Sequence, residues 1–70
     1  MTILNQKDLI EALVNGDVMT FDVEECIVEL MYNGECFLKI TSNGSETRWN
    51  SEEIYEVYKD LEEEQVELYS

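Results

Sequence analysis

The chain of 70 residues contains no histidine and no proline, and only four of its side chains are basic. Without histidine it lacks the side chain that most often moves protons near neutral pH and most often binds metal ions. Its two cysteines, Cys26 and Cys36, are too few for a zinc site, which needs about four ligands. Neither a glycine-rich phosphate loop nor a calcium-binding loop occurs. These absences predict a protein that is not an enzyme and that uses no cofactor or metal ion.

Long apolar runs are also missing, because the unbroken apolar stretches extend over only two or three residues. A membrane-spanning helix needs about 20 such residues. The first residues, MTILNQKDLIEALVNG, show no basic region followed by an apolar run, as a signal peptide would. Two cysteines without an extracellular context are typical of reduced thiols. The predicted location is therefore the cytoplasm, which is the host bacterial cytoplasm if a phage encodes the chain.

What the sequence does contain is acid, since 17 acidic residues face four basic ones and the net charge is −13. The hydrophobic fraction of 44% is too high for a disordered chain, so we expect one folded domain over residues 1–70. Its acidity makes nucleic acids and anionic membranes poor partners and makes a basic protein the natural one. The simpler alternative is that the acidity only keeps a small protein soluble.

Residues 5–15 are predicted to form a helix. Asn5 is a suitable N-cap, and Leu4 and Leu9 stand at the two positions of a hydrophobic staple. Gly16 is a suitable C-terminal stop. The predicted buried stripe of this helix consists of Leu9, Ile10, Leu13 and Val14.

Residues 17–41 have the alternation of three strands, with a turn near residues 24–25 and a hairpin turn at Asn33-Gly34. A two-residue turn would pair Tyr32 with Glu35 and would mix charge into both faces of the hairpin. A three-residue loop with a glycine bulge pairs Met31 with Glu35 instead. We favour the bulged loop, because it collects six apolar residues on one face. They are Cys26, Val28, Leu30, Cys36, Leu38 and Ile40.

In that register the opposite face of the hairpin holds Ile27, Met31 and Phe37. Three large apolar side chains are more than a solvated sheet face usually carries. Either a helix covers this face as well, or these three residues form the interface of a homodimer. Both cysteines are predicted to be small core residues, too far apart for a disulfide.

Residues 46–49 can form a short fourth strand, and a second helix follows. Asn50 and Glu53 have the spacing of a capping box, and Trp49 and Ile54 that of a staple. The predicted fold is a small α+β domain of order α-β-β-β-α, in which two helices flank a three-stranded antiparallel meander.

The second helix carries an acidic stripe, an arc about 120° wide on a helical wheel that contains no base. Its residues are Glu52, Glu53, Glu56, Asp60, Glu63, Glu64 and Glu67, and the apolar side holds Ile54, Val57, Tyr58, Leu61 and Leu68. Acids near the end of a helix oppose its dipole, each at a cost of about 0.3–1 kcal/mol before screening. Stability therefore does not explain them, whereas binding to a basic surface does. The alternative is a frayed, solvated tail.

Other acids are expected to broaden this surface, and tyrosines near it to anchor a partner. The acids with the strongest claim are Asp22, Glu24 and Glu25, followed by Asp17 and Glu46. The tyrosines are Tyr55, Tyr58 and Tyr69.

The size, the charge, the element order and the stripe EEIYEVYKDLEEEQVE over residues 52–67 together give a resemblance. The chain resembles the small, very acidic DNA-mimic inhibitors of bacteriophages, which include anti-CRISPR proteins and early host-takeover proteins. It is similar in style to acidic early proteins of large lytic Bacillus phages, among them a type that blocks the histone-like nucleoid protein HU. The resemblance implies a basic DNA-binding host protein as partner, inhibition by occlusion and no catalysis.

Two other classes remain open. One is an acidic adaptor or antitoxin-like module that binds a protein without competing with DNA. The other is an acidic structural subunit. A mimic competes with DNA for its partner, whereas an adaptor leaves the partner's DNA binding intact.

Overall fold

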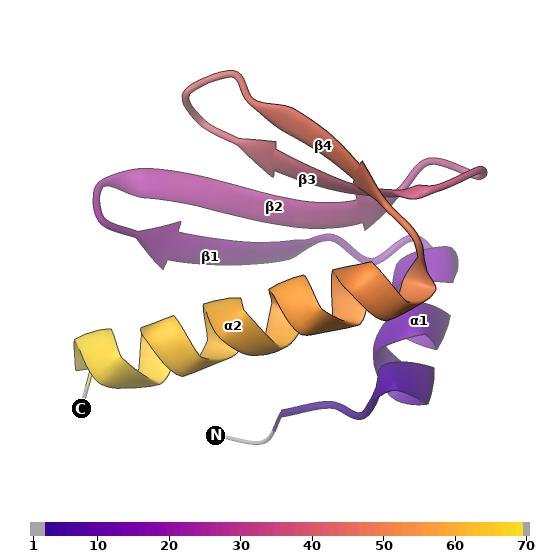
Figure 1. Ribbon diagram of the computed structural model, residues 1–70, viewed down its shortest axis with the longest axis horizontal. Coiled ribbons are helices and arrows are strands. Elements are labelled where there is room, and N and C mark those ends of the chain that lie inside the picture. Colours follow the sequence, from indigo (N-terminus) through magenta and orange to yellow (C-terminus); the bar gives the residue numbers. More distant parts are fainter. Residues whose placement is uncertain (1–2, 70) are drawn as a thin grey trace.

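The computed structural model describes residues 3–69, with side chains placed as far as residue 65. Its elements are α1 (Gln6–Val14), β1 (Met19–Val23), β2 (Cys26–Tyr32), β3 (Phe37–Thr41), β4 (Glu46–Trp49) and α2 (Ser51–Tyr69). The strands form one antiparallel sheet in the order β1-β2-β3-β4. Both helices lie against the same face of this sheet, α2 along it and α1 at one end (Figure 1). The predicted α+β meander is confirmed, and the short fourth strand is present.

The ends of α1 are formed by the predicted residues. The Oδ1 atom of Asn5 accepts a hydrogen bond from the N–H of Asp8 at 2.8 Å, which confirms the N-cap. Gly16 adopts a φ of 103°, a left-handed conformation, and its N–H donates to the carbonyl of Leu13 at 3.1 Å. This is the glycine-terminated helix end that the sequence predicts.

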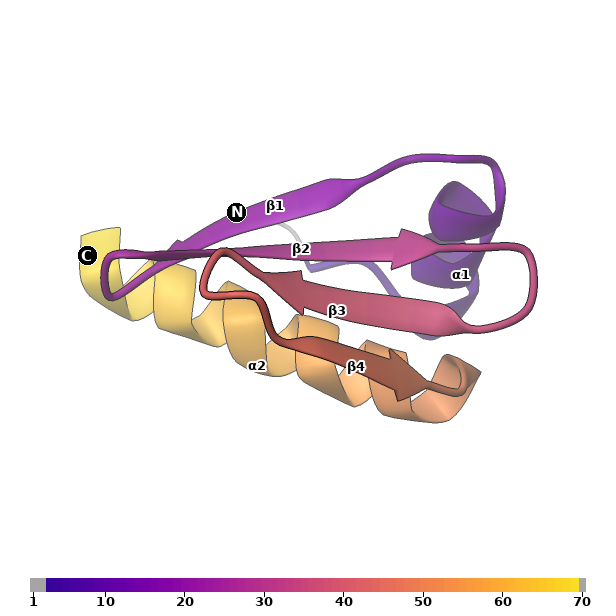
Figure 2. The ribbon, with the colours of Figure 1, turned by 90° about the horizontal axis from the view of Figure 1, so that it is seen from above.

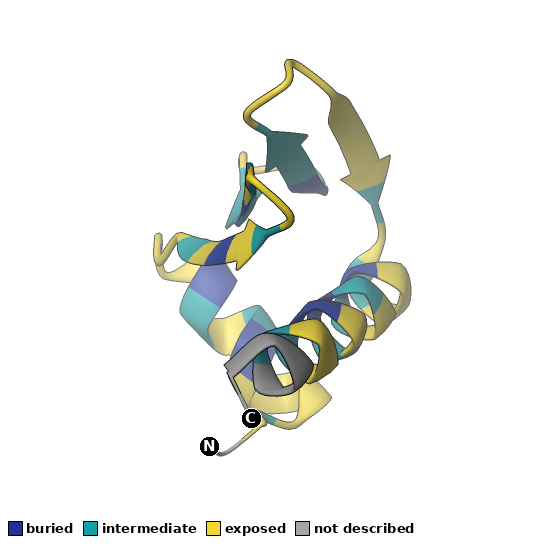
Figure 3. Cartoon of the chain, turned by 90° about the vertical axis from the view of Figure 1, so that its left-hand side faces the viewer, coloured by how far each residue is buried: buried dark blue, intermediate teal, exposed yellow. Residues whose placement is uncertain are grey.

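The core lies between the sheet and the two helices (Figure 3). Its buried members are Leu9, Leu13, Phe21, Val28, Leu30, Phe37, Ile54, Tyr58 and Leu61. The predicted stripe of α1 is wrong at Val14, which is 51% exposed. Helix α1 is only nine residues long and packs with one narrow side. Leu9 and Leu13, one turn apart, occupy that side, whereas Val14 points 100° away from Leu13.

The predicted register of the β2–β3 hairpin is wrong. Tyr32 pairs with Phe37 and Met31 pairs with Leu38, so neither a two-residue nor a three-residue loop occurs. Instead, residues 33–36 form a four-residue loop between the paired strands. Because strand side chains alternate, this shift decides which residues of β3 face the helices.

The side chain of Asn33 accounts for the longer loop. Its Oδ1 atom accepts hydrogen bonds from the N–H groups of Glu35 at 2.8 Å and of Cys36 at 2.9 Å. The N–H of Asn33 itself donates to the carbonyl of Cys36 at 3.2 Å. With Gly34 at a φ of 99°, these bonds satisfy the backbone of an Asx-type turn. The first paired residue of β3 is therefore Phe37, two residues later than the Glu35 that the apolar pattern predicts.

The new register separates the three residues of the predicted dimer interface. Phe37 lies in the core and is 7% exposed, on the face covered by the helices. Ile27 and Met31 lie on the outer face of the sheet, where Leu38 pairs with Met31. The trio Ile27, Met31 and Phe37 thus cannot form one interface through a single face of the sheet.

Candidate partner-binding surface

The start of α2 is fixed by the predicted capping box. The Oδ1 atom of Asn50 accepts from the N–H of Glu53 at 2.8 Å, and the Oε1 atom of Glu53 accepts from the N–H of Asn50 at 3.1 Å. Ile54, Tyr58 and Leu61 then face the sheet and are buried. This packing turns the opposite side of α2 toward solvent.

The acidic stripe lies on that solvent side. Six of its seven side chains are exposed: Glu52, Glu53, Glu56, Asp60, Glu63 and Glu64. The seventh, Glu67, belongs to the helix, but its side chain lies outside the described part of the chain. The predicted segregation of acids from the buried side of the helix is thus confirmed as far as residue 65.

The stripe has the linear charge density of a nucleic-acid strand. From residue 52 to residue 64, six carboxylates are distributed over about 18 Å of helix axis, one for roughly every 3.6 Å. A single strand of B-form DNA carries one phosphate charge per about 3.4 Å. A surface that binds a row of phosphates can therefore meet a comparable row of carboxylates here.

One base lies beside the stripe. The Nζ atom of Lys59 is 3.2 Å from the Oε1 atom of Glu56 and 5.0 Å from the ring centroid of Tyr55. The hydrogen bond to Glu56 raises the pKa of Lys59 above its usual value. Among residues 3–65 this is the one ion pair, so it neutralises part of one carboxylate only.

The β1–β2 turn presents two further acids. Val23 pairs with Cys26, which leaves Glu24 and Glu25 as a two-residue hairpin loop. Their φ angles are 45° and 68°, so both residues are left-handed. Tight hairpins of this kind favour Asn-Gly, because a side chain with a Cβ atom is strained at positive φ. Two adjacent glutamates are therefore held in a conformation that costs stability.

Helix α2 holds this turn close to the stripe. The Nε2 atom of Gln65 donates a hydrogen bond to the backbone carbonyl of Asp22, next to the turn. Figure 1 shows the β1–β2 turn and the later turns of α2 at the same end of the molecule. The structure thus brings together the later part of the acidic stripe and a group that we call the acidic turn, which consists of Asp22, Glu24 and Glu25, all exposed.

Two other acids predicted to broaden this surface lie elsewhere. Asp17 precedes β1 at the opposite end of that strand from Glu24 (Figure 2). Glu46 lies on β4, where it pairs with Ile40 on the outer face of the sheet. Neither one extends the acidic stripe.

The tyrosines contribute less than predicted. Tyr58 is 2% exposed, and its hydroxyl oxygen accepts a hydrogen bond from the N–H of Leu4 at 3.0 Å. Burial raises the pKa of its hydroxyl. The prediction that Tyr58 contacts a partner is therefore wrong, because the ring belongs to the core. Tyr55 is half-buried beside the stripe, and the side chain of Tyr69 lies outside the described residues.

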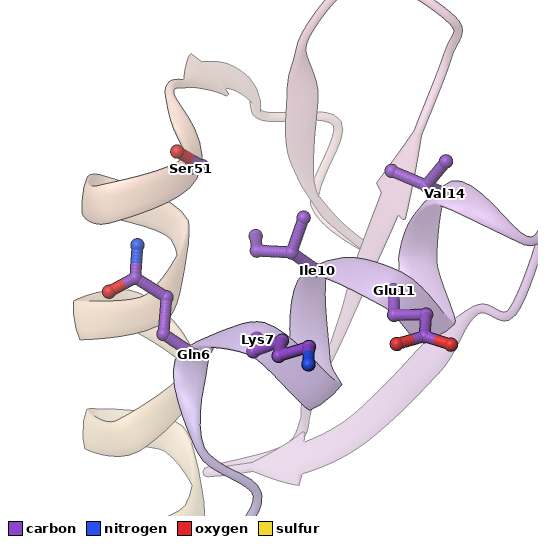
Figure 4. A pocket seen from close by; sticks show the side chains of 6 residues that line it. All are labelled: Gln6, Lys7, Ile10, Glu11, Val14 and Ser51. Atoms are coloured by element: carbon purple, nitrogen blue, oxygen red, sulfur yellow. The ribbon is translucent and has the colours of Figure 1, made fainter.

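Away from the acidic surface, a shallow hollow lies between α1 and the first turn of α2 (Figure 4). Ile10 points into it, and Val14 lies at its far side. The rest of its lining consists of Gln6, Lys7, Glu11 and Ser51. Its surface is mostly apolar and open to solvent, without a convergent group of polar side chains.

The two thiols are free and half-buried, and neither is in the core cluster, so the prediction that they are core residues is wrong. The Oγ atom of Ser42 donates a hydrogen bond to the Sγ atom of Cys26 at 3.4 Å, which lowers the pKa of this thiol. Cys36 lies in the loop fixed by Asn33. The burial of both cysteines therefore depends on the turns beside them and not on the apolar pattern of the strands.

Nowhere in the described part of the chain do three acidic or cysteine side chains converge as ligands for a metal ion. Its helices include none that is both long enough and apolar enough to cross a membrane. No protein-family model, curated protein or solved structure matches this chain.

Proposed function

We propose that this protein is a DNA mimic that binds a basic DNA-binding protein through the acidic stripe and the acidic turn, and thereby blocks DNA binding. An HU-like nucleoid protein of the bacterial cytoplasm is the candidate target. The protein is an inhibitor that acts by occupying a surface, and it catalyses no reaction.

The observation that carries this proposal is the placement of acids where they oppose stability. Glu67 lies in the last turn of α2, at the negative end of the helix dipole, where the helix has no basic residue. Glu24 and Glu25 occupy strained left-handed positions in a tight turn. Solubility alone can be supplied by acids at unstrained positions anywhere on the surface. Binding to a basic surface gives a reason for these particular positions.

Exchange of one polyanion for another provides the mechanism. A protein that binds DNA without sequence preference gains most of its affinity when its Lys and Arg side chains neutralise phosphates and release counterions. A rigid helix with a similar spacing of carboxylates can satisfy the same side chains. Because no base is read, inhibition by this protein should not depend on the sequence of the displaced DNA.

The proposal is tested by fluorescence anisotropy with a labelled duplex bound to a purified HU-like protein. Added inhibitor should release the duplex completely, at the same concentration for two duplexes of unrelated sequence. Retention of the duplex, with a rise in anisotropy from a complex of all three components, would instead support the adaptor function.

The matched controls are two triple variants of equal net charge. One replaces Asp60, Glu63 and Glu64 of the stripe with lysine and should release no DNA. The other replaces Glu11, Asp17 and Glu35, which lie at the α1 end of the molecule, and should act almost like the unchanged protein (Figure 2). If the two variants lose activity equally, net charge matters and the stripe does not.

A further inference from the structure

The β3–β4 hairpin differs in charge from the rest of the molecule. Residues 37–49 contain two of the four bases of the chain, Lys39 and Arg48, but only one of its 17 acids, Glu46. Because the net charge of the chain is −13, most of the molecular surface repels a second copy of the chain. The hairpin is the region where that repulsion is weakest.

Strand β4 is also an open edge. It is the last strand of the sheet, and the side chains of Glu46, Thr47 and Arg48 are exposed (Figure 3). The N–H of Thr41 donates to the carbonyl of Ser45 at 2.9 Å, which fixes the alternation of the β3–β4 ladder. Thr47 therefore directs its backbone groups toward β3, whereas Glu46 and Arg48 direct theirs away from the sheet.

The other edge of the sheet is protected. The outward carbonyl of Asp22 on β1 accepts the hydrogen bond from Gln65 of α2. The acidic turn at the end of β1 adds two exposed glutamates. Natural sheets commonly block pairing by covering an edge or charging it in this way. Strand β4 carries two exposed charges of opposite sign, Glu46 and Arg48, which repel a second copy in some registers and attract it in another.

The outward backbone groups of β4 allow three antiparallel registers between two copies of the strand. In one register Glu46 faces Glu46 of the second copy, and in another Arg48 faces Arg48. In the third, Glu46 faces Arg48 twice and Thr47 faces Thr47. Opposite charges across a strand pair are stabilising and like charges are destabilising. One register of the three is therefore favoured.

We infer that the chain forms a homodimer in which β4 pairs antiparallel with β4 of a second copy in this third register. Four backbone hydrogen bonds join residues 46 and 48 of the two copies, and two Glu46–Arg48 ion pairs flank them. The interface is isologous, with its two-fold axis at Thr47. It replaces the predicted interface of Ile27, Met31 and Phe37, which do not share a face. This inference does not depend on the proposed function.

The dimer has a consequence for the acidic surface. A two-fold axis perpendicular to the joined sheet leaves both α2 helices on the same side of it. Two acidic stripes then face one side of the dimer. Their mutual repulsion means that dimers should form more readily when salt screens the net charge, since the Debye length falls from about 30 Å at 0.01 M to about 8 Å at 0.15 M.

Sedimentation equilibrium tests the inference with a charge swap. At roughly 0.3 M salt, where screening is strong, the unchanged protein should approach twice the chain mass at loading concentrations up to about 1 mM. Glu46→Arg or Arg48→Glu alone should weaken the dimer at least tenfold, because each turns two attractive pairs into repulsive ones. The double variant should recover to within about threefold of the unchanged protein, because both pairs are restored in reverse.

Net charge is controlled by Asp17→Arg, which changes the charge of the chain as much as Glu46→Arg but lies beyond the other edge of the sheet. It should leave dimerisation unchanged or strengthen it. A chain that stays monomeric throughout, single variants that still dimerise, or a double variant no better than the single ones would overturn the inference.

Disulfide trapping tests the register itself. With Cys26 and Cys36 replaced by serine, Thr47→Cys should form an inter-chain disulfide on mild oxidation. Directly opposed residues of a non-hydrogen-bonded pair have Cα atoms about 4.5 Å apart, within the range of a disulfide. Thr20→Cys, which is also an exposed position but lies on the β1 edge, is the control and should not cross-link. Equal cross-linking at both positions, or none at residue 47, would contradict the inference.

Discussion

The two edges of this sheet, which we call the β1 side and the β4 side, differ in charge and in the exposure of their backbone groups. At the β1 side, the acidic turn and the later turns of α2 come together, and Gln65 occupies one outward carbonyl of the strand. At the β4 side, the hairpin of residues 37–49 has more bases than acids and leaves its edge open. If the acids only kept the protein soluble, no such division would be needed. We propose that each side meets a different partner, a basic protein at the acidic turn and a second copy at β4.

The two hairpin turns show the same division. In the β3–β4 loop, Gly44 occupies the left-handed position with a φ of 98°, and the side chain of Asn43 accepts from the N–H of Ser45 at 3.1 Å. That loop has the residues its geometry favours. In the β1–β2 loop, Glu24 and Glu25 occupy left-handed positions that suit Asn-Gly. Stability explains the first turn but not the second.

The largest expected effect is the loss of partner binding when acids of the acidic stripe are replaced. Replacing Asp60, Glu63 and Glu64 with lysine should weaken binding of the basic partner more than about 100-fold, because a row of attractions becomes a row of repulsions. The same change should leave the thermal midpoint nearly unchanged, because all three side chains are exposed. Titration calorimetry and circular dichroism measure the two quantities. Intact binding in a folded variant would contradict the role of the stripe.

Salt should have opposite effects on partner binding, at the β1 side, and on dimerisation, at the β4 side. Between about 50 mM and 200 mM salt, partner binding should weaken at least tenfold, because it depends on attraction between opposite charges and on counterion release. Dimerisation over the same range should strengthen, because the net repulsion between copies is screened. Calorimetry and sedimentation at matched salt concentrations compare the two effects. If both changed in the same direction, the two sides would not differ as we describe.

A smaller effect is expected from the β1–β2 turn, where charge and strain can be separated. The pair Glu24→Asn and Glu25→Gly should raise the free energy of unfolding by about 1–2 kcal/mol, because it relieves left-handed side-chain residues. It should also weaken partner binding about fivefold. The control pair, Glu24→Gln and Glu25→Gln, removes the same charge and keeps the strain. It should weaken binding equally without the gain in stability measured by urea unfolding.

The smallest expected effect concerns the base beside the stripe. Lys59→Gln frees the carboxylate of Glu56 and should tighten partner binding about twofold, because one attraction to the partner is no longer shared. Lys7→Gln on α1 changes the net charge equally and should have a smaller effect. Weaker binding of the Lys59 variant would mean that its ammonium group contacts the partner directly.

Much of this fold was predictable from local sequence signals. The helix caps at Asn5, Gly16 and Asn50, the order of the elements and the exposed arc of α2 all depend on residues within a few positions of one another. The pattern of apolar spacing correctly places Ile54, Tyr58 and Leu61 on the buried side of α2. Such signals are reliable because the physical interaction is itself local.

The wrong predictions arise where a polar side chain bonds to the backbone, because the spacing of apolar residues carries no sign of such a bond. Asn33 extends a loop by accepting two N–H groups, which moves Phe37 from the predicted outer face to the core. The adjacent apolar residues Phe37 and Leu38 were a usable sign, since neighbours on a strand cannot share a face. The link between Gln65 and Asp22 spans 43 positions of the chain and has no sequence signal.

The most direct test of the account is to map the partner's contact on this protein by NMR. The backbone amide signals of the isotope-labelled protein are followed during titration with a basic DNA-binding protein, at salt low enough to keep the chain monomeric. We expect shifts around Asp22 to Glu25 and along α2 from Glu52 onward, with residues 37–49 unchanged. Shifts concentrated on the β3–β4 hairpin, with the acidic side unaffected, would contradict it.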